Sequence, residues 1–142
     1  MKKAEFIIKG TTPCKKNMLE IRTRYKNYKF RRWIAPNDKY QDWEEGAAKE
    51  LWIQAREDTA FINDLLPIEY PVWLKVVFYR KKKQKIDLTN LLQSIEDALA
   101  KANIIKDDSQ INSFDGSRVF FGHDDERAEI TLYWPLKEHR GD

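Results

Sequence analysis

The segment from residue 85 to residue 110 constrains the fold more than any other part of the chain, because it places polar side chains at both ends of one amphipathic helix. Apolar residues recur there at three- and four-residue steps, the period of a helix with one buried face. They are Leu88, Leu91, Leu92, Ile95, Leu99 and Ala102. The pattern predicts a helix over residues 88–100, capped at its start by Asp87 or Thr89 and followed by Asp107 and Asp108.

The carboxylates at the two ends of this helix are candidate ligands of a metal ion. Mg²⁺ prefers oxygen ligands, so a strand ending in a carboxylate, a helix and a second pair of carboxylates can form a divalent-cation site. The alternative is two ordinary solvated turns. The helix would be about 20 Å long, and the return from residue 101 to Asp108 spans at most about 26 Å, which just brings Asp108 back beside Asp87. A helix continuing to residue 103 would instead require one carboxylate from a partner subunit.

Length and composition indicate one folded domain, residues 1–142. The chain is long enough to bury its own core, and with 42% hydrophobic residues it is expected to fold although 35% of its residues are charged. No apolar run is long enough to cross a bilayer, so a cytoplasmic protein without membrane contact is expected. Cys14 is the single cysteine, which excludes a disulfide framework and a cysteine-based metal cluster.

The net charge of +3 conceals an uneven distribution along the chain. Residues 1–35 carry eleven basic and two acidic side chains, whereas residues 87–142 carry twelve acidic and six basic ones. A basic half can attract a polyanion while an acidic half holds the metal ion that acts on it. The distribution favours phosphodiester chemistry. Glycine-rich phosphate loops, Ser/His/Asp arrangements and Cys/His zinc spacings do not occur in the sequence, which removes most other common enzyme classes.

The first part of the chain predicts a strand, a basic aromatic segment and a helix. The strand covers residues 5–9. In residues 19–33, aromatic side chains interleave with arginine and lysine, as in surfaces that neutralise phosphates and stack on bases. The alternative is an irregular hairpin whose rings face the core. An apolar stripe then predicts a helix over residues 38–58, with Trp43 and Trp52 in the core. This helix is extended or followed by Phe61, Ile62, Leu65 and Leu66.

The second part of the chain predicts a central strand and a later hairpin. Residues 72–79 are β-branched or aromatic almost throughout, which predicts a strand buried on most of both faces. The lysine-rich residues 80–85 follow; they form either a solvated loop or, because they adjoin Asp87, a phosphate-binding surface. Residues 118–134 predict a hairpin. Its tip, residues 123–126, is expected to be a solvated acidic loop and not a metal cluster.

Three motifs in the central segment carry a family resemblance. They are Asp87-Leu88-Thr89-Asn90-Leu91-Leu92-Gln93, Asp97-Ala98-Leu99 and Asp107-Asp108-Ser109-Gln110, preceded by the Pro-x-x-x-Asn spacing of Pro13 and Asn17. The pattern resembles the RusA family of Holliday junction resolvases, common in prophages, whose core reads approximately Asp-x-Asp-Asn-Leu-x-Lys, Asp-Ala-Leu and Asp-Asp-x-Gln at the same spacings.

The resemblance implies a small α+β fold with two main helices packed on a mixed sheet. It also implies a homodimer that cuts four-way DNA junctions with Mg²⁺, for which Mn²⁺ substitutes. The family's catalytic carboxylates match Asp87 and Asp108, with Asp107 adjacent, so these three are the expected metal ligands. The basic residues are expected to grip the DNA backbone without reading sequence. They are Lys15, Lys16, Arg22, Arg24, Lys29, Arg31, Arg32, Lys81, Lys82, Lys83, Lys85 and Arg118.

Two catalytic positions depart from the family pattern. Thr89 stands in place of a second aspartate, and a hydroxyl adds no negative charge to hold the ion. Gln93 stands in place of a catalytic lysine, and glutamine cannot neutralise charge that develops in the transition state; Lys85 is a candidate substitute. Both departures favour an alternative function, a junction-binding protein with weak or lost catalysis. A third hypothesis is an α+β domain whose partner is another protein, which predicts no salt-dependent affinity for DNA.

Overall fold

The computed structural model describes residues 2–58 and 66–135. In chain order, the elements are β1 (Lys2–Lys9), η1 (Lys15–Met18), β2 (Leu19–Lys26), β3 (Lys29–Pro36), α1 (Asp38–Asp58), β4 (Val72–Arg80), α3 (Leu88–Lys101), η2 (Asp108–Gln110), β5 (Ile111–Ser113), β6 (Arg118–Phe121) and β7 (Arg127–Trp134). Two long helices and a mixed sheet confirm the expected α+β fold. The predicted contributions of Phe61, Ile62 and Leu65 fall outside the described residues.

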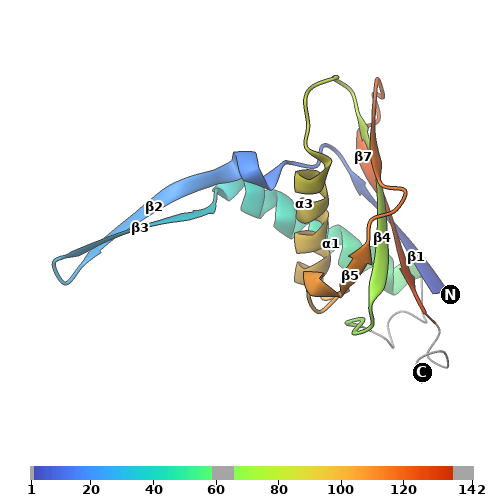
Figure 1. The fold of residues 1–142 in the computed structure, drawn as a ribbon, viewed down its shortest axis with the longest axis horizontal. Coiled ribbons are helices and arrows are strands. Elements are labelled where there is room, and N and C mark those ends of the chain that lie inside the picture. The colour runs from blue at the N-terminus through green and yellow to red at the C-terminus, as the bar shows by residue number, and fades with distance from the viewer. Residues whose placement is uncertain (1, 59–65, 136–142) are drawn as a thin grey trace.

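A five-stranded mixed sheet forms one layer of the protein, and α1 and α3 lie on one side of it (Figure 1). The strand β4 is central, with antiparallel β7 along one edge and parallel β5 and β6 along the other. Every second side chain of β4 is buried, whereas Trp73 on the opposite face is 48% exposed. The prediction that this strand is buried on most of both faces is therefore wrong, because the helices cover only one face.

The two helices form where their apolar stripes predicted them. In α3 the buried side chains are Leu91, Leu92, Ser94, Ile95, Ala98 and Leu99. In α1 the main-chain N–H of Tyr40 donates to Asn37 Oδ1 over 2.9 Å, which caps the first turn. Trp43 is half-buried against the core, but Trp52 is 46% exposed and stacks on the Arg56 guanidinium. The prediction of a core position is therefore wrong for Trp52.

The predicted hairpin over residues 118–134 is not formed. β6 pairs with β4 in parallel, and β7 pairs with the opposite edge of β4. The connection between them crosses the end of β4, where the N–H groups of Gly122 and His123 donate to the carbonyls of Lys81 and Arg80. Its residues 123–125 are exposed, as expected of a solvated loop. Alternating polarity identified the strand β7 but did not identify its partners.

The hairpin of β2 and β3 projects from the body as an arm, defined here as residues 19–36 (Figure 1). The strands pair regularly from Leu19 opposite Pro36 to Lys26 opposite Lys29. Asn27 and Tyr28 close the turn with positive φ angles of 55° and 62°, the conformation that matches the twist of a two-residue hairpin. Tyr25 and Tyr28 are exposed, so the alternative in which the rings face the core is wrong.

Candidate active site

Asp87 stands at the junction between the lysine-rich loop and α3. Its backbone is extended, and its side-chain Oδ1 accepts a hydrogen bond of 2.9 Å from the N–H of Thr89. Of the two predicted caps, Asp87 is therefore the one used. One carboxylate oxygen is engaged at the helix start, which leaves the other oxygen available to a ligand.

Asp87 lines a pocket of about 580 Å³ between η1, the end of β4 and the start of α3. The lining residues are Cys14, Lys16, Asn17, Arg80, Gln84, Lys85, Ile86, Asp87, Asn90 and Leu91. Three cations therefore surround one carboxylate, an environment that attracts a phosphate group. The position of Lys85 here is consistent with its suggested role beside the site.

Arg80 belongs to the basic segment 80–85 but was not among the individually predicted DNA-binding residues, and the structure places it in this pocket. Its Nη1 donates to the Thr12 carbonyl over 2.9 Å, which fixes the side chain at the exit of β4. Burial lowers the pKa of the Arg80 guanidinium, and Glu126 partly offsets that effect. An arginine stays protonated after such a shift, so the pocket keeps a positioned positive charge.

Asp107 and Asp108 lie in the segment that follows α3. The Asp107 carboxylate accepts from the N–H and the hydroxyl of Ser109, and these hydrogen bonds lower its pKa. Gln110 fixes this segment to the chain before β4. Its Oε1 accepts from the Asp107 N–H over 2.8 Å, and its Nε2 donates to the Tyr70 carbonyl over 3.0 Å. The glutamine of the Asp-Asp-x-Gln motif therefore has a structural role, because it holds the Asp107–Asp108 segment against the chain before β4.

The structure does not bring Asp87 and Asp108 together within one chain. Asp87 follows the end of β4, whereas η2 leads into Ile111, which pairs with Val72 at the start of β4. α3 separates them by its fourteen residues, a length of about 21 Å; Figure 1 shows the two ends of the helix far apart. Among residues 2–58 and 66–135, no three His, Cys, Asp or Glu side chains are grouped to hold a metal ion. The sequence left open whether the loop returns Asp108 to Asp87 or a partner subunit supplies one carboxylate, and the structure does not show the return within a single subunit.

Thr89 and Gln93 lie outside the pocket. Both are exposed on α3. They lie on the same side of the helix as half-buried Glu96 and Ala100, the second of which also packs against the core, and these four residues are here called the α3 stripe. Within one chain, therefore, neither residue contributes to the pocket that holds Asp87.

Sequence reasoning did not identify Glu96 as a functional residue. In the structure it lies on the α3 stripe beside other carboxylates. Burial, together with the negative charges of the neighbouring carboxylates Asp108 and Asp97, raises the pKa of Glu96 to about 7. The second of these is already engaged, because Asp97 accepts from Lys15 Nζ at 2.8 Å and from the Tyr40 hydroxyl at 2.6 Å. Negative charge therefore accumulates toward the end of α3, away from the cationic pocket.

The predicted DNA-binding cations divide into engaged and exposed groups. Lys15 is held by Asp97, and Arg22 is paired with Glu20 at 3.0 Å and Asp38 at 3.5 Å. These two side chains link η1 and the arm to the helices, and their role in DNA binding stays a prediction. Lys81 lies 3.9 Å from Asp124, and Arg118 lies over Phe120. The exposed remainder are Lys16, Arg24, Lys29, Arg31, Arg32, Lys82, Lys83 and Lys85.

Comparison with known proteins gives one family match. The family described as Endodeoxyribonuclease RusA matches residues 17–133, which include the pocket, α3 and the Asp107–Asp108 segment. No curated protein matches the chain significantly. Among the described residues, no helix is long and apolar enough to cross a membrane. The match covers most of the chain, and the chain therefore belongs to the RusA family of endodeoxyribonucleases, whose activity is the resolution of Holliday junctions.

Proposed function

We propose that this protein is a Mg²⁺-dependent endodeoxyribonuclease that cuts four-way DNA junctions as a two-fold dimer. One observation carries the proposal: Asp87 shares a pocket with Lys16, Arg80 and Lys85 in a chain of the RusA family. A carboxylate with a free oxygen suits a hard cation, and the surrounding cations suit the phosphate to be cut. A two-fold dimer also matches the approximate two-fold symmetry of a four-way junction.

The proposed active site is completed by the second subunit. Thr89 and Ala100 are equidistant from the midpoint of α3, as are Gln93 and Glu96. A two-fold axis through this midpoint would pair the two α3 stripes antiparallel and set Gln93 against Glu96 of the partner subunit. The same operation carries the partner's Asp108 toward Asp87. The stripe suits such close contact because three of its four side chains are uncharged.

Each residue of the proposed site has a distinct role. Asp87, with Asp107 and Asp108 of the partner subunit, would hold the cation. When bound, the cation polarises the scissile phosphate and lowers the pKa of a bound water. Lys16 and Lys85 would bind the phosphate oxygens and offset the negative charge that grows on them. Thr89 would add a neutral oxygen ligand beside Asp87.

The direct test replaces Asp87 with asparagine and measures cleavage of a synthetic four-way junction in Mg²⁺ on a denaturing gel. Asparagine caps helices as well as aspartate does, so the fold is expected to be unaffected. We expect cleavage to fall by roughly 100-fold or more. The matched control is Asp115→Asn, because Asp115 is an exposed carboxylate in the loop before β6. Cleavage at the wild-type rate by Asp87→Asn would remove this residue from the mechanism.

A second candidate function is junction binding with weak or lost catalysis. The observations that favour it are Thr89 and Gln93, which replace a family carboxylate and lysine, and the position of Gln93 outside the pocket. Tight junction binding without product in Mg²⁺ or Mn²⁺ would support it, particularly if a Thr89→Asp, Gln93→Lys variant gained cleavage. Cleavage by the wild-type chain at a rate that the Thr89→Asp, Gln93→Lys variant does not raise would exclude it.

A further inference from the structure

The arm has two chemically different faces. The register places each residue of β2 opposite one of β3, and successive pairs point to opposite sides. One face carries the pairs Glu20/Ala35, Arg22/Trp33, Arg24/Arg31 and Lys26/Lys29. The other face carries Leu19/Pro36, Ile21/Ile34, Thr23/Arg32 and Tyr25/Phe30. The arm is therefore basic on the first face and largely apolar on the second.

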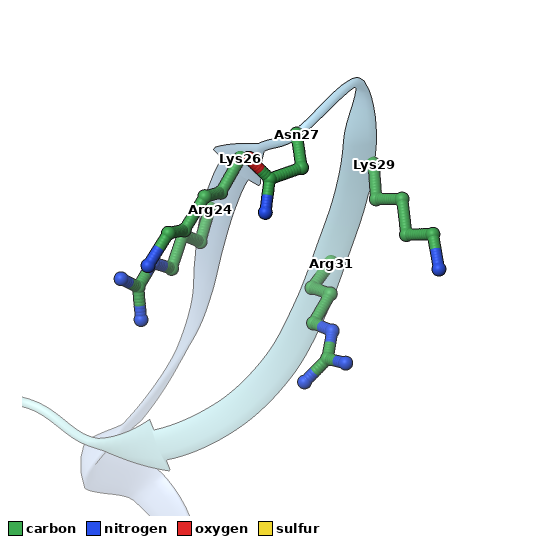
Figure 2. Close-up of a pocket in the computed structure, with 5 residues that line it drawn as sticks. All are labelled: Arg24, Lys26, Asn27, Lys29 and Arg31. Atoms are coloured by element: carbon green, nitrogen blue, oxygen red, sulfur yellow. The ribbon is translucent and has the colours of Figure 1, made fainter.

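The basic face is suited to DNA. A hollow of about 370 Å³ near the tip is lined by four cations and an amide, Arg24, Lys26, Asn27, Lys29 and Arg31 (Figure 2). Such a cluster neutralises phosphates without reading sequence. The pairs Leu19/Pro36 and Ile21/Ile34 contribute little to this contact, because their side chains lie on the opposite side of the ribbon and away from its tip.

The apolar face is uncovered in a single chain. Ile21 and Ile34, which pair across the strands, are each 69% exposed, and Tyr25 is 68% exposed. A two-stranded ribbon is marginally stable by itself, and an exposed apolar patch on a soluble protein marks a surface that another protein covers. The aliphatic side chains of Ile21 and Ile34 offer phosphates no hydrogen bond or charge, so DNA is a poor occupant for the part of the face that they form. Arg32, which lies over Phe30 nearer the tip, is the one cation on this face.

We propose that the apolar face of the arm packs against a second copy of this chain, so that the arm of each subunit contacts the other subunit. The inference rests on the proposed two-fold dimer. Figure 1 shows the arm leaving the body on the side of α3 that faces away from the sheet. The burial pattern places the α3 stripe on the helix opposite the buried residues, and therefore on this same side. A second copy seated on this stripe would therefore lie beside the arm.

The area that a stable dimer requires supports the same occupant. The α3 stripe alone offers a surface about 21 Å long and about 10 Å wide, or about 200 Å². Stable interfaces bury roughly 800 Å² on each partner. An eight-residue ribbon is about 27 Å long and about 10 Å wide. Each subunit would bury this area on its own arm and a similar area where the partner's arm packs. Together with the α3 stripe, the buried area on each subunit is roughly 700 Å². The arms would therefore supply most of the contact.

The test replaces Ile21 and Ile34 together with threonine. Threonine keeps the β-branched shape that strands prefer, so the hairpin is retained while its apolar surface is reduced. The matched control is Arg24→Ser with Arg31→Ser, a neighbouring cross-strand pair on the basic face. The dimer dissociation constant is measured by sedimentation equilibrium without DNA or metal, and circular dichroism verifies the fold. A stronger variant, Ile21→Glu with Ile34→Glu, is examined in parallel.

We expect the threonine pair to raise the dimer dissociation constant by roughly 10-fold or more, and the serine pair to leave it unchanged while weakening junction binding. An unchanged dissociation constant in both the threonine and glutamate pairs would overturn the inference, as would a monomeric wild-type chain. The dimer measurement and the cleavage measurement test the arm and the proposed function separately. Failure of Asp87→Asn to reduce cleavage would reject the catalytic assignment and leave the arm result standing.

Discussion

Asp87 directly precedes α3 as its N-cap and Asp108 follows the end of α3, so the two carboxylates stand at opposite ends of the same fourteen-residue helix. Each end has its own anchor. Asp87 caps the helix start, and Gln110 ties the segment after the helix to the Tyr70 carbonyl. Both anchors hold the carboxylates in place without bringing them together. Assembly of two subunits is consequently the step on which the proposed cation site depends.

Gln110→Ala is predicted to loosen the segment that carries Asp107 and Asp108. The change removes hydrogen bonds to the Ile68 and Tyr70 carbonyls, which then lack these partners. We expect a loss of about 1–3 kcal/mol in the free energy of unfolding, together with slower junction cleavage. Urea unfolding and a gel assay measure the two effects. Asn112→Ala, an exposed change nearby in β5, is the control and is expected to alter neither.

Asp97→Ala is predicted to destabilise the protein independently of DNA or metal. The carboxylate accepts from Lys15 at 2.8 Å and from Tyr40 at 2.6 Å, which joins η1, α1 and α3. Burial and the bond to Asp97 raise the pKa of the Tyr40 phenol, so the hydroxyl remains a donor that needs an acceptor. We expect a loss of about 2 kcal/mol in urea unfolding. Equal unfolding midpoints for Asp97→Ala and the exposed control Asp115→Ala would contradict this role.

Glu96 is predicted to make stability depend on pH in metal-free buffer. Its pKa is about 7 in the folded protein against 4.5 for an unperturbed group, so between these values the folded state holds a proton that the unfolded state has released. Stability therefore falls as pH rises from about 4.5 to about 7, by about 1–2 kcal/mol after allowance for solvent screening.

Glu96→Gln removes the titrating group and tests this account. The amide is neutral at every pH, so the variant should be more stable than wild type at pH 8 and should lose the decline between pH 5 and pH 8. Urea unfolding with a chelator present measures both. Glu50→Gln, at an exposed position of α1, should leave the wild-type decline intact. A decline of the same size in Glu96→Gln would assign it to other groups.

Lys82→Ser with Lys83→Ser is predicted to weaken junction binding in a salt-dependent manner. Both lysines are exposed in the loop that enters the Asp87 pocket. Removal of two phosphate contacts should reduce the slope of log affinity against log salt by about 2. Fluorescence anisotropy over a salt series gives the slope, with Lys49→Ser on α1 as the control. An unchanged slope would exclude these lysines from the DNA contact.

Local sequence signals predicted the local structure well. The buried stripe of α3 follows from three- and four-residue spacing and occurs as predicted. Side-chain chemistry predicted a cap at Asp87 or Thr89, and Asp87 is the one used. The long strand β4 also follows from composition. Trp52 shows the limit of the same reasoning, because packing spacing put it on the buried face whereas it sits at the helix margin against Arg56.

Local sequence signals could not predict which distant segments of the chain pair with each other. Nothing in the alternation of residues 118–134 indicates that β6 and β7 flank β4 instead of each other. The course of the chain after α3 likewise depends on distant contacts, the bridge between Ile68 and Ile105 and the clamp by Gln110. These contacts direct Asp108 away from Asp87, and chain length alone could not reveal that direction.

Mixing two inactive variants tests the two-subunit site most directly. The Asp87→Asn subunit retains Asp108, and the Asp108→Asn subunit retains Asp87. In a mixed dimer these two retained carboxylates meet in one complete site, whereas the other site lacks both. After subunit exchange at equal concentrations, nicking of a four-way junction in Mg²⁺ should return to about one quarter of the wild-type rate. A mixture that remains as inactive as each variant alone would contradict the account.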